Sequence, residues 1–286
     1  MTAGRSDGTW WRGLMAAAVL ASPALAQKSV YWPAQFNEYP EVTLARSAQS
    51  DNFVVFWGQL AGPDPTQAPP AIDFDPAAVL AELESVYATY ITQVGFLDDT
   101  VGNLAAYKII VVMNDTWSSG PWTGWAFGAS YDNTIGAMWV HPDATPGPSW
   151  VLAHELAHTL QNQVFIDNPG HGLVNFEPTG SFWETHAQFM AGLHHPTLLE
   201  SVDLIRFFNT QHFFFASTRH HYGNTLFLHH LRDEYGLDFI NRIWREANAG
   251  TEDAPLAIMR IMGWTQEDLN DCFGMAAARN VVFDYT

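Results

Sequence analysis

The chain has a single cysteine, Cys272, among its 286 residues, so no internal disulfide can form. Stability must therefore come from a packed core, and an aromatic content of 14% is consistent with one. Cys272 itself is expected to be a small buried hydrophobe.

Basic residues are nearly absent from the first two thirds of the chain. Between residues 47 and 205 the only Lys or Arg is Lys108, against 17 Asp and Glu, and the net charge is −18. Such an acidic surface disfavours nucleic acids and anionic membranes as partners. No apolar run reaches the roughly 18 residues of a membrane span, so no membrane partner is expected.

The first 26 residues are typical of an export signal. Arg5 and Arg12 supply positive charge, residues 14–20 are apolar, and the small-residue sequence at 24–26 fits a cleavage site. We therefore expect residues 1–26 to be a signal peptide and the protein to be secreted, in an extracellular or periplasmic location.

Three compact apolar runs predict buried strands, at residues 52–57, 108–113 and 135–140. A helix starting at Pro76 and capped by Asp75 is expected between the first two runs. A Gly- and Trp-rich loop is expected over residues 115–131.

The remainder of the chain has helical patterns. Ser149 is a good N-cap for a helix over about 150–164, and another helix is expected over 182–193. Further helices are expected at 198–208, 221–235, 237–247 and 265–278. This order predicts an α+β fold with a mixed β-sheet, divided into a catalytic lobe at 27–196 and a helical C-terminal lobe at 197–286.

The pentapeptide at residues 154–158, HELAH, predicts a metal site. His154 and His158 lie four residues apart, so on a helix both imidazoles face the same way and can bind one metal ion. Glu155 is placed to hold a water molecule and not to bind the metal. Two neutral imidazoles and a non-ligating carboxylate are typical of a catalytic zinc site.

A catalytic zinc ion needs a third protein ligand and one open position. Gln161 and Val164 stand where the metzincin pattern requires Gly and His, which excludes that class. The remaining nearby candidates are Asp167, His171, Glu177, Glu184 and His186. Glu184 is favoured because it would project from an otherwise apolar helix, where a zinc ion would compensate its burial; His186 comes second.

These motifs resemble the gluzincin metallopeptidases, in which one helix supplies two His and the next a Glu. The strand at 52–58, the WAFG sequence at 125–128, and the motifs HELAHTLQ, FWETHAQ and HHYGNTLF are similar to a family of secreted microbial gluzincin-like proteins. That family is catalogued mainly as a domain of unknown function and includes virulence-associated proteins of plant-pathogenic bacteria. The resemblance implies a zincin-like fold and a Zn²⁺ site of His154, His158 and Glu184. The sequence departs from this pattern at Gln188, where thermolysin-like members carry an Asp that orients a zinc-bound His. The side-chain carbonyl of Gln188 can accept a hydrogen bond from an imidazole N–H but adds no negative charge.

The expected reaction is peptide hydrolysis by a zinc-activated water, with Glu155 as the proton acceptor. A hydrogen-bond donor to the developing oxyanion is expected from the cluster Arg219, His220, His221 and Tyr222. Tyr222 is favoured because a phenol donates without needing to be protonated first, and His221 follows. Substrate is expected along the strand at 135–140 if that strand forms the rim of the cleft.

Two other histidine pairs, at 194–195 and 229–230, are adjacent in sequence and would point in different directions on a helix. We interpret them as surface or packing residues and not as a second metal site.

The leading hypothesis is a secreted, monomeric zinc metalloendopeptidase acting on a peptide or protein substrate. One alternative is a secreted binding or virulence protein that retains zinc with little turnover, which Gln188 favours. Another alternative is a zinc hydrolase acting on glycosylated protein, with sugars stacked on the aromatic side chains of the loop, Trp117, Trp122, Trp125 and Phe127. A core role for these four rings is equally expected.

Overall fold

The computed structural model describes residues 27–173, 182–283 and 285. The expected signal peptide and the ligand candidate Glu177 lie outside the described residues. Within those ranges, no helix has the length and apolar character needed to cross a membrane.

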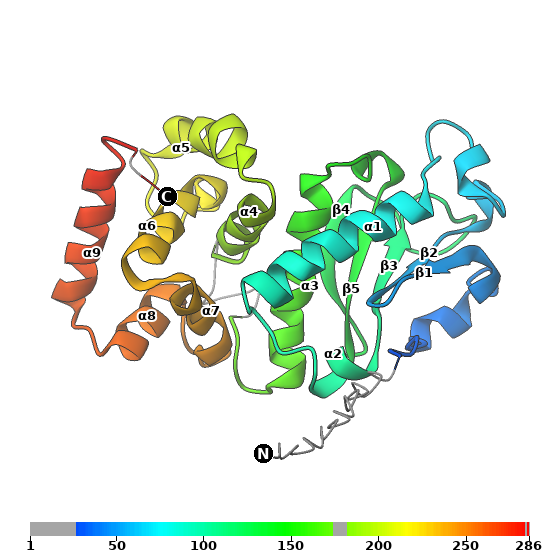
Figure 1. The fold of residues 1–286 in the computed structure, drawn as a ribbon, viewed down its shortest axis with the longest axis horizontal. Coiled ribbons are helices and arrows are strands. Elements are labelled where there is room, and N and C mark those ends of the chain that lie inside the picture. Colours follow the sequence, from blue (N-terminus) through cyan, green and yellow to red (C-terminus); the bar gives the residue numbers. More distant parts are fainter. Residues whose placement is uncertain (1–26, 174–181, 284, 286) are drawn as a thin grey trace, which may run out of the picture.

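A mixed five-stranded sheet forms the centre of the N-terminal half (Figure 1). Its strands are β1 (Ser47–Gln49), β2 (Phe53–Phe56), β3 (Ile109–Met113), β4 (Ala126–Tyr131) and β5 (Ile135–Val140), in the order β1-β2-β3-β5-β4. The inner strands β2, β3 and β5 are parallel, whereas β1 and β4 pair antiparallel at the edges. Every residue of the three inner strands is buried, as expected for continuous apolar runs.

Two expectations for this region are wrong. The loop expected over residues 115–131 ends in strand β4. This strand has no continuous apolar run, because small residues occupy its middle and only Tyr131 at its end is buried. The strand at 135–140 is not a rim strand, because β5 pairs with β3 on one side and β4 on the other. The edge strand next to β5 is therefore β4, and Gly128 of β4 lies opposite Met138 of β5.

Three helices accompany the sheet. They are α1 (Pro76–Tyr87), which continues into a π-helical segment (Ala88–Gln93), α2 (Gly102–Ala106) and α3 (Trp150–Asp167). The predicted caps are confirmed: the Asp75 side chain accepts from Ala77 N–H, and the Ser149 side chain accepts from Leu152 N–H. Helix α3 packs against β4, β5 and α1, and its opposite face meets α4 of the helical half.

The C-terminal half is helical and lies beside the sheet half (Figure 1). Its helices are α4 (Phe182–His194), α5 (Leu204–Thr210), α6 (Thr225–Tyr235), α7 (Leu237–Glu246), α8 (Ala254–Met262) and α9 (Gln266–Arg279). Short segments precede two of them, the π-helical Leu199–Asp203 before α5 and the 3₁₀ helix η8 (His221–Asn224) before α6. The α+β fold class is confirmed, and Cys272 is buried in α9 as predicted.

Candidate metal centre

Helices α3 and α4 bring three predicted side chains together. His154 Nε2 lies 3.0 Å from Glu184 Oε2, and His158 Nε2 lies 3.5 Å from the same oxygen. The two imidazole Nε2 atoms are 3.1 Å apart. Ligands at about 2.0–2.1 Å from a tetrahedral ion stand roughly 3.4 Å from one another. The group of His154, His158 and Glu184 therefore has the spacing of a metal site.

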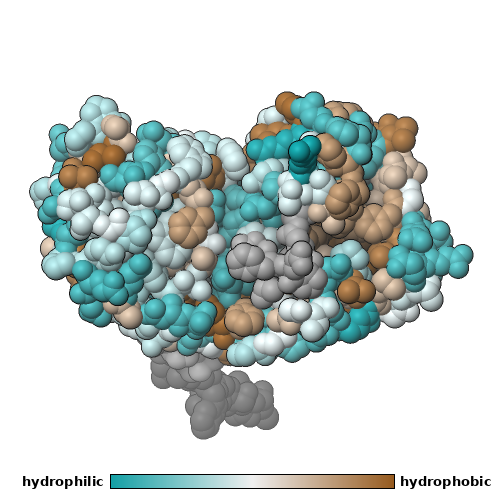
Figure 2. Space-filling view, turned by 180° about the vertical axis from the view of Figure 1, so that it is seen from behind, coloured by the Kyte–Doolittle hydropathy of each residue, from teal (hydrophilic) through white to brown (hydrophobic). Residues whose placement is uncertain are grey.

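These side chains line a cavity of about 340 Å³ between the two halves of the molecule. From behind, Figure 2 shows the surface hollowed between the halves. Strand β4 contributes one wall with Ala126, Phe127 and Gly128, and η8 contributes Tyr222 from the helical half.

Aromatic rings surround the two imidazoles. Trp183 stacks on His158, with ring centroids 5.1 Å apart and planes at 10°, and Trp150 meets His154 edge-on. Burial lowers the pKa of His154 to about 4, although a hydrogen bond to Glu184 opposes the shift. A neutral imidazole is the form that binds metal, so the pocket holds His154 ready to act as a ligand.

Glu155 lies between the two histidines in sequence and faces the same cavity. It is 7% exposed. Burial raises its pKa to about 7, against the opposing charge of His158. Its Oε2 has no hydrogen-bond partner among the described residues. A carboxylate with a free oxygen and a pKa near neutrality suits proton transfer.

Gln161 positions His158, a role that sequence reasoning missed. The amide of Gln161 donates to the carbonyl of Trp183 at 3.1 Å, and its Oε1 lies 2.8 Å from His158 Nδ1. His158 Nδ1 must therefore carry the proton and donate it, which leaves the lone pair on Nε2, facing Glu184. The i, i+3 spacing from His158 could have indicated this contact.

Gln188 does not make the predicted contact with a zinc-site histidine. Its amide instead donates to Asp203 Oδ1 at 2.8 Å. Gln188 Oε1 and His154 Nδ1 are both buried and have no hydrogen-bond partner among the described residues. Asp203 is itself buried, which raises its pKa to about 7. Neither Asp203 nor its pairing with Gln188 was predicted.

Of the four residues expected to supply an oxyanion donor, Tyr222 lines the cavity. Its ring centroid is 5.9 Å from that of His154. Burial raises the pKa of Tyr222, and the nearby Glu184 carboxylate adds to the shift, so the phenol stays protonated. Arg206 of α5 lies over the Tyr222 ring, with the guanidinium carbon 4.2 Å from the ring centre. Arg206 was not among the predicted site residues.

The other three members of the cluster have different neighbours. Arg219 lies over the ring of Phe213, and His220 Nδ1 is 2.8 Å from Thr210 Oγ1. The backbone carbonyl of His221 accepts a hydrogen bond from Thr185 Oγ1 at 2.6 Å.

The alternative ligands stand apart from the group. Asp167 accepts hydrogen bonds from Asn103 N–H and from the Gln163 amide, both at 2.8 Å. His186 is fully buried and lies against the Trp244 ring, while its Nδ1 is 2.9 Å from the Gln161 amide. His171 pairs with Asn248 through the backbone.

The chain belongs to a family of unknown function, DUF6055, whose model matches residues 22–286. A search of curated proteins finds no match. The family match covers α3, α4, β4 and η8, so it includes all the side chains of the metal centre, and it attaches no activity to them.

Close contact between β4 and α3 depends on a glycine of the WAFG sequence. A Cβ atom on Gly128 would lie 2.3 Å from the backbone oxygen of Glu155 and 2.7 Å from His158 Cβ. Gly136 of β5 is similarly close to Thr159 of α3. Because these two glycines have no side chains, β4 and β5 can lie close to the part of α3 that carries Glu155 and His158.

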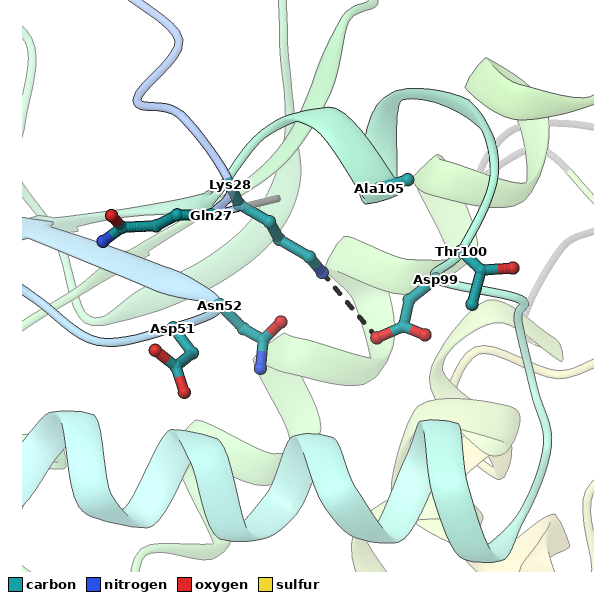
Figure 3. A pocket seen from close by; sticks show the side chains of 7 residues that line it. All are labelled: Gln27, Lys28, Asp51, Asn52, Asp99, Thr100 and Ala105. Atoms are coloured by element: carbon teal, nitrogen blue, oxygen red, sulfur yellow. Dashed lines mark ion pairs between the residues drawn. The ribbon is translucent and has the colours of Figure 1, made fainter. Parts of the chain in front are cut away.

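A second cavity, of about 630 Å³, lies near the start of the described chain (Figure 3). Lys28 there pairs with Asp99 at 3.7 Å and donates to the Tyr87 hydroxyl at 3.0 Å. The charges of Lys28 and Asp99 thus compensate each other. The lining residues of this cavity include no histidine or cysteine, so the reactive groups converge at the α3–α4 cavity instead.

Proposed function

We propose that this protein is a secreted zinc-dependent endopeptidase with a zincin-like, gluzincin-type site. The observation that carries the proposal is the convergence of His154, His158 and Glu184 in one cavity, with Glu155 beside them. Three protein ligands and an open cavity are typical of a catalytic zinc site, whereas a structural site usually has four protein ligands.

The donor set fits zinc. Two imidazole nitrogens and one carboxylate oxygen match the ligand type of a hydrolytic zinc site and are unsuited to Ca²⁺ or Mg²⁺, which prefer oxygen. Gln161 fixes the proton of His158 on Nδ1, so Nε2 is available to the ion. The spacing of 3.0 to 3.5 Å between the donor atoms supports the same ligand set.

Each side chain of the site would have a separate role in peptide hydrolysis. A bound zinc ion would polarise the scissile carbonyl and make a water molecule more acidic. Glu155 would accept the proton of that water and deliver it to the leaving amine, as its raised pKa favours. Tyr222 would donate a hydrogen bond to the carbonyl oxygen as negative charge develops there.

An extended peptide substrate would bind along β4. This strand is at the edge of the sheet, and residues Ala126 to Ala129 line the cavity. Edge strands bind peptides by main-chain hydrogen bonding, which accommodates many sequences. The proposal therefore expects a protein or peptide substrate and a monomeric enzyme.

A second candidate is a zinc hydrolase that acts on glycosylated protein. Trp125 and Phe127 are 56% and 48% exposed at the rim of the cavity, where they could stack on sugar rings. Trp117 and Trp122 are buried in the core and cannot take part. Faster cleavage of glycosylated than of bare peptides, lost in Trp125→Ala, would favour this candidate.

The test combines metal analysis with peptide cleavage. His154→Ala and Glu184→Ala should lose zinc from the α3–α4 site and all cleavage of an unbiased peptide library. Glu155→Gln should keep zinc and lose turnover, because an amide cannot accept the proton. His212→Ala, at an exposed histidine, is the matched control and should retain both. Full turnover by Glu155→Gln would refute the mechanism, and zinc binding without cleavage by the wild type would favour the binding-protein alternative.

A further inference from the structure

We propose a second site for a divalent transition-metal ion, formed by Glu82, His194 and His195. The carboxylate belongs to α1, and the two imidazoles stand at the end of α4. Their donor atoms lie within 4.8 Å of one another. The ion would join the sheet half to the helical half and would be structural.

The location is separate from the first site. His194 follows Glu184 by ten residues on α4, a rise of about 15 Å along the helix axis. The expectation that adjacent histidines diverge is wrong here, because α4 ends at His194 and His195 lies beyond it. The two ring centroids are 4.6 Å apart.

In the part of the chain that the structure describes, Nε2 of the His195 ring makes no hydrogen bond. This nitrogen atom is buried. The nearest Glu82 oxygen is 3.5 Å away, which is longer than a normal hydrogen bond and close to the roughly 3.4 Å between two ligands of a tetrahedral ion. The spacing suits an ion between the two groups better than direct contact.

His194 is held in a form that can bind metal. The Thr89 hydroxyl donates to the Ser85 carbonyl at 3.3 Å and lies 2.8 Å from His194 Nδ1. Because its own proton is directed to Ser85, the Thr89 oxygen can accept from Nδ1–H, which leaves a lone pair on His194 Nε2.

The types of donor atom determine which metal ions this second site can bind. Two imidazoles and one carboxylate suit Zn²⁺, Co²⁺, Ni²⁺ or Cu²⁺, whereas Ca²⁺ and Mg²⁺ would require more oxygen ligands. Glu82 Oε1 also accepts a hydrogen bond from Ser149 N–H at 3.2 Å. Since Ser149 caps α3, an ion here would fix the start of the helix that carries His154.

The test is zinc stoichiometry in metal-free full-length protein, titrated with Zn²⁺ and measured by elemental analysis after desalting. Wild type should bind two equivalents. His194→Ala/His195→Ala and His154→Ala/His158→Ala should each bind one, and His212→Ala should bind two. Glu82→Gln retains an acceptor for Ser149 N–H but loses the charge, so it should bind one equivalent and remain folded by circular dichroism.

Thermal melting adds a second readout. Zinc should raise the melting temperature of His154→Ala/His158→Ala, and Glu82→Gln in that background should abolish the rise. A wild type that binds one equivalent, lost in His154→Ala/His158→Ala, would overturn this inference and leave the proposed function standing. One equivalent lost only in His194→Ala/His195→Ala would support the inference and overturn the proposed function.

Discussion

Replacement of Gly128 by alanine tests whether the contact between β4 and α3 shapes the metal centre. The new Cβ would lie 2.3 Å from Glu155 O, 2.7 Å from His158 Cβ and 3.0 Å from Thr159 N. Two of these three atoms belong to the backbone of a buried helix and cannot rotate away. The strand or the helix must therefore move by roughly 1 Å to restore a normal contact near 3.5 Å.

The expected cost follows from that displacement. Overpacking a well-packed core usually costs about 1–3 kcal/mol, and a clash with helix backbone belongs at the upper end. For a chain of this size, about 3 kcal/mol corresponds to a fall of roughly 6–12 °C in melting temperature. Because the displaced turn carries Glu155 and His158, zinc affinity and turnover should fall as well.

Differential scanning calorimetry of metal-loaded Gly128→Ala, beside zinc titration, measures both effects. Gly274→Ala is the matched control, since Gly274 lies in α9 with no heavy atom within 4 Å of an added Cβ. That change should be neutral or stabilise by about 0.5–1 kcal/mol. If Gly128→Ala melts within about 1 °C of wild type and binds zinc normally, the close approach of β4 to α3 is wrong.

Three further predictions concern single side chains. Gln161→Leu removes the acceptor for His158 Nδ1–H and should lower zinc affinity at the first site by about 10- to 100-fold in competition titrations. An unchanged zinc affinity would refute the proposal that Gln161 orients His158. Tyr222→Phe should lower kcat at a cost of roughly 3 kcal/mol with unchanged KM and zinc content; equal kcat would remove Tyr222 from the mechanism. Burial lowers the pKa of His229 to about 4 from 6.5, and the charge of Arg232 adds to the shift. As pH falls from 6.5 towards 4, the unfolded chain therefore binds a proton at this position before the folded chain does, and up to about 3 kcal/mol of stability should be lost. His229→Gln should lose less stability than the wild type when urea unfolding at pH 7 is compared with urea unfolding at pH 5.

Elements governed by local pattern could be predicted from the sequence. The strands β2, β3 and β5 are continuous apolar runs buried on both faces, and α1 and α3 begin at the side chains expected to cap them. Strand β4 could not be recognised in this way, because small residues at its close contact with α3 replace the apolar ones that would mark a strand.

The proximity of the metal-centre side chains could be predicted because helix periodicity places His154 beside His158, and Glu184 is an acid on an apolar helix. Their supporting contacts were not predictable. Arg206 reaches Tyr222 across 16 positions of sequence, and its placement depends on how α5 packs on η8. The approach of His195 to Glu82 depends on where α4 ends and on how α4 packs against the π-helical segment that follows α1.

The Gln188–Asp203 pair shows what the departure from the gluzincin pattern does to the centre. A carboxylate that accepts directly from a zinc-site imidazole would make that ring a stronger ligand. Here the carboxylate of Asp203 accepts a hydrogen bond from the Gln188 amide, and burial raises the pKa of Asp203 to about 7, so the carboxylate is only partly ionised near neutrality. His154 Nδ1 and Gln188 Oε1, both buried and without partners in the described part of the chain, each bear a desolvation cost of about 1–3 kcal/mol. A hydrogen bond between them would remove both costs, but a neutral amide would orient the ring without adding charge. The proposed binding of zinc by His154 would thus depend more on geometry and burial than on a charged hydrogen-bond partner behind the ring.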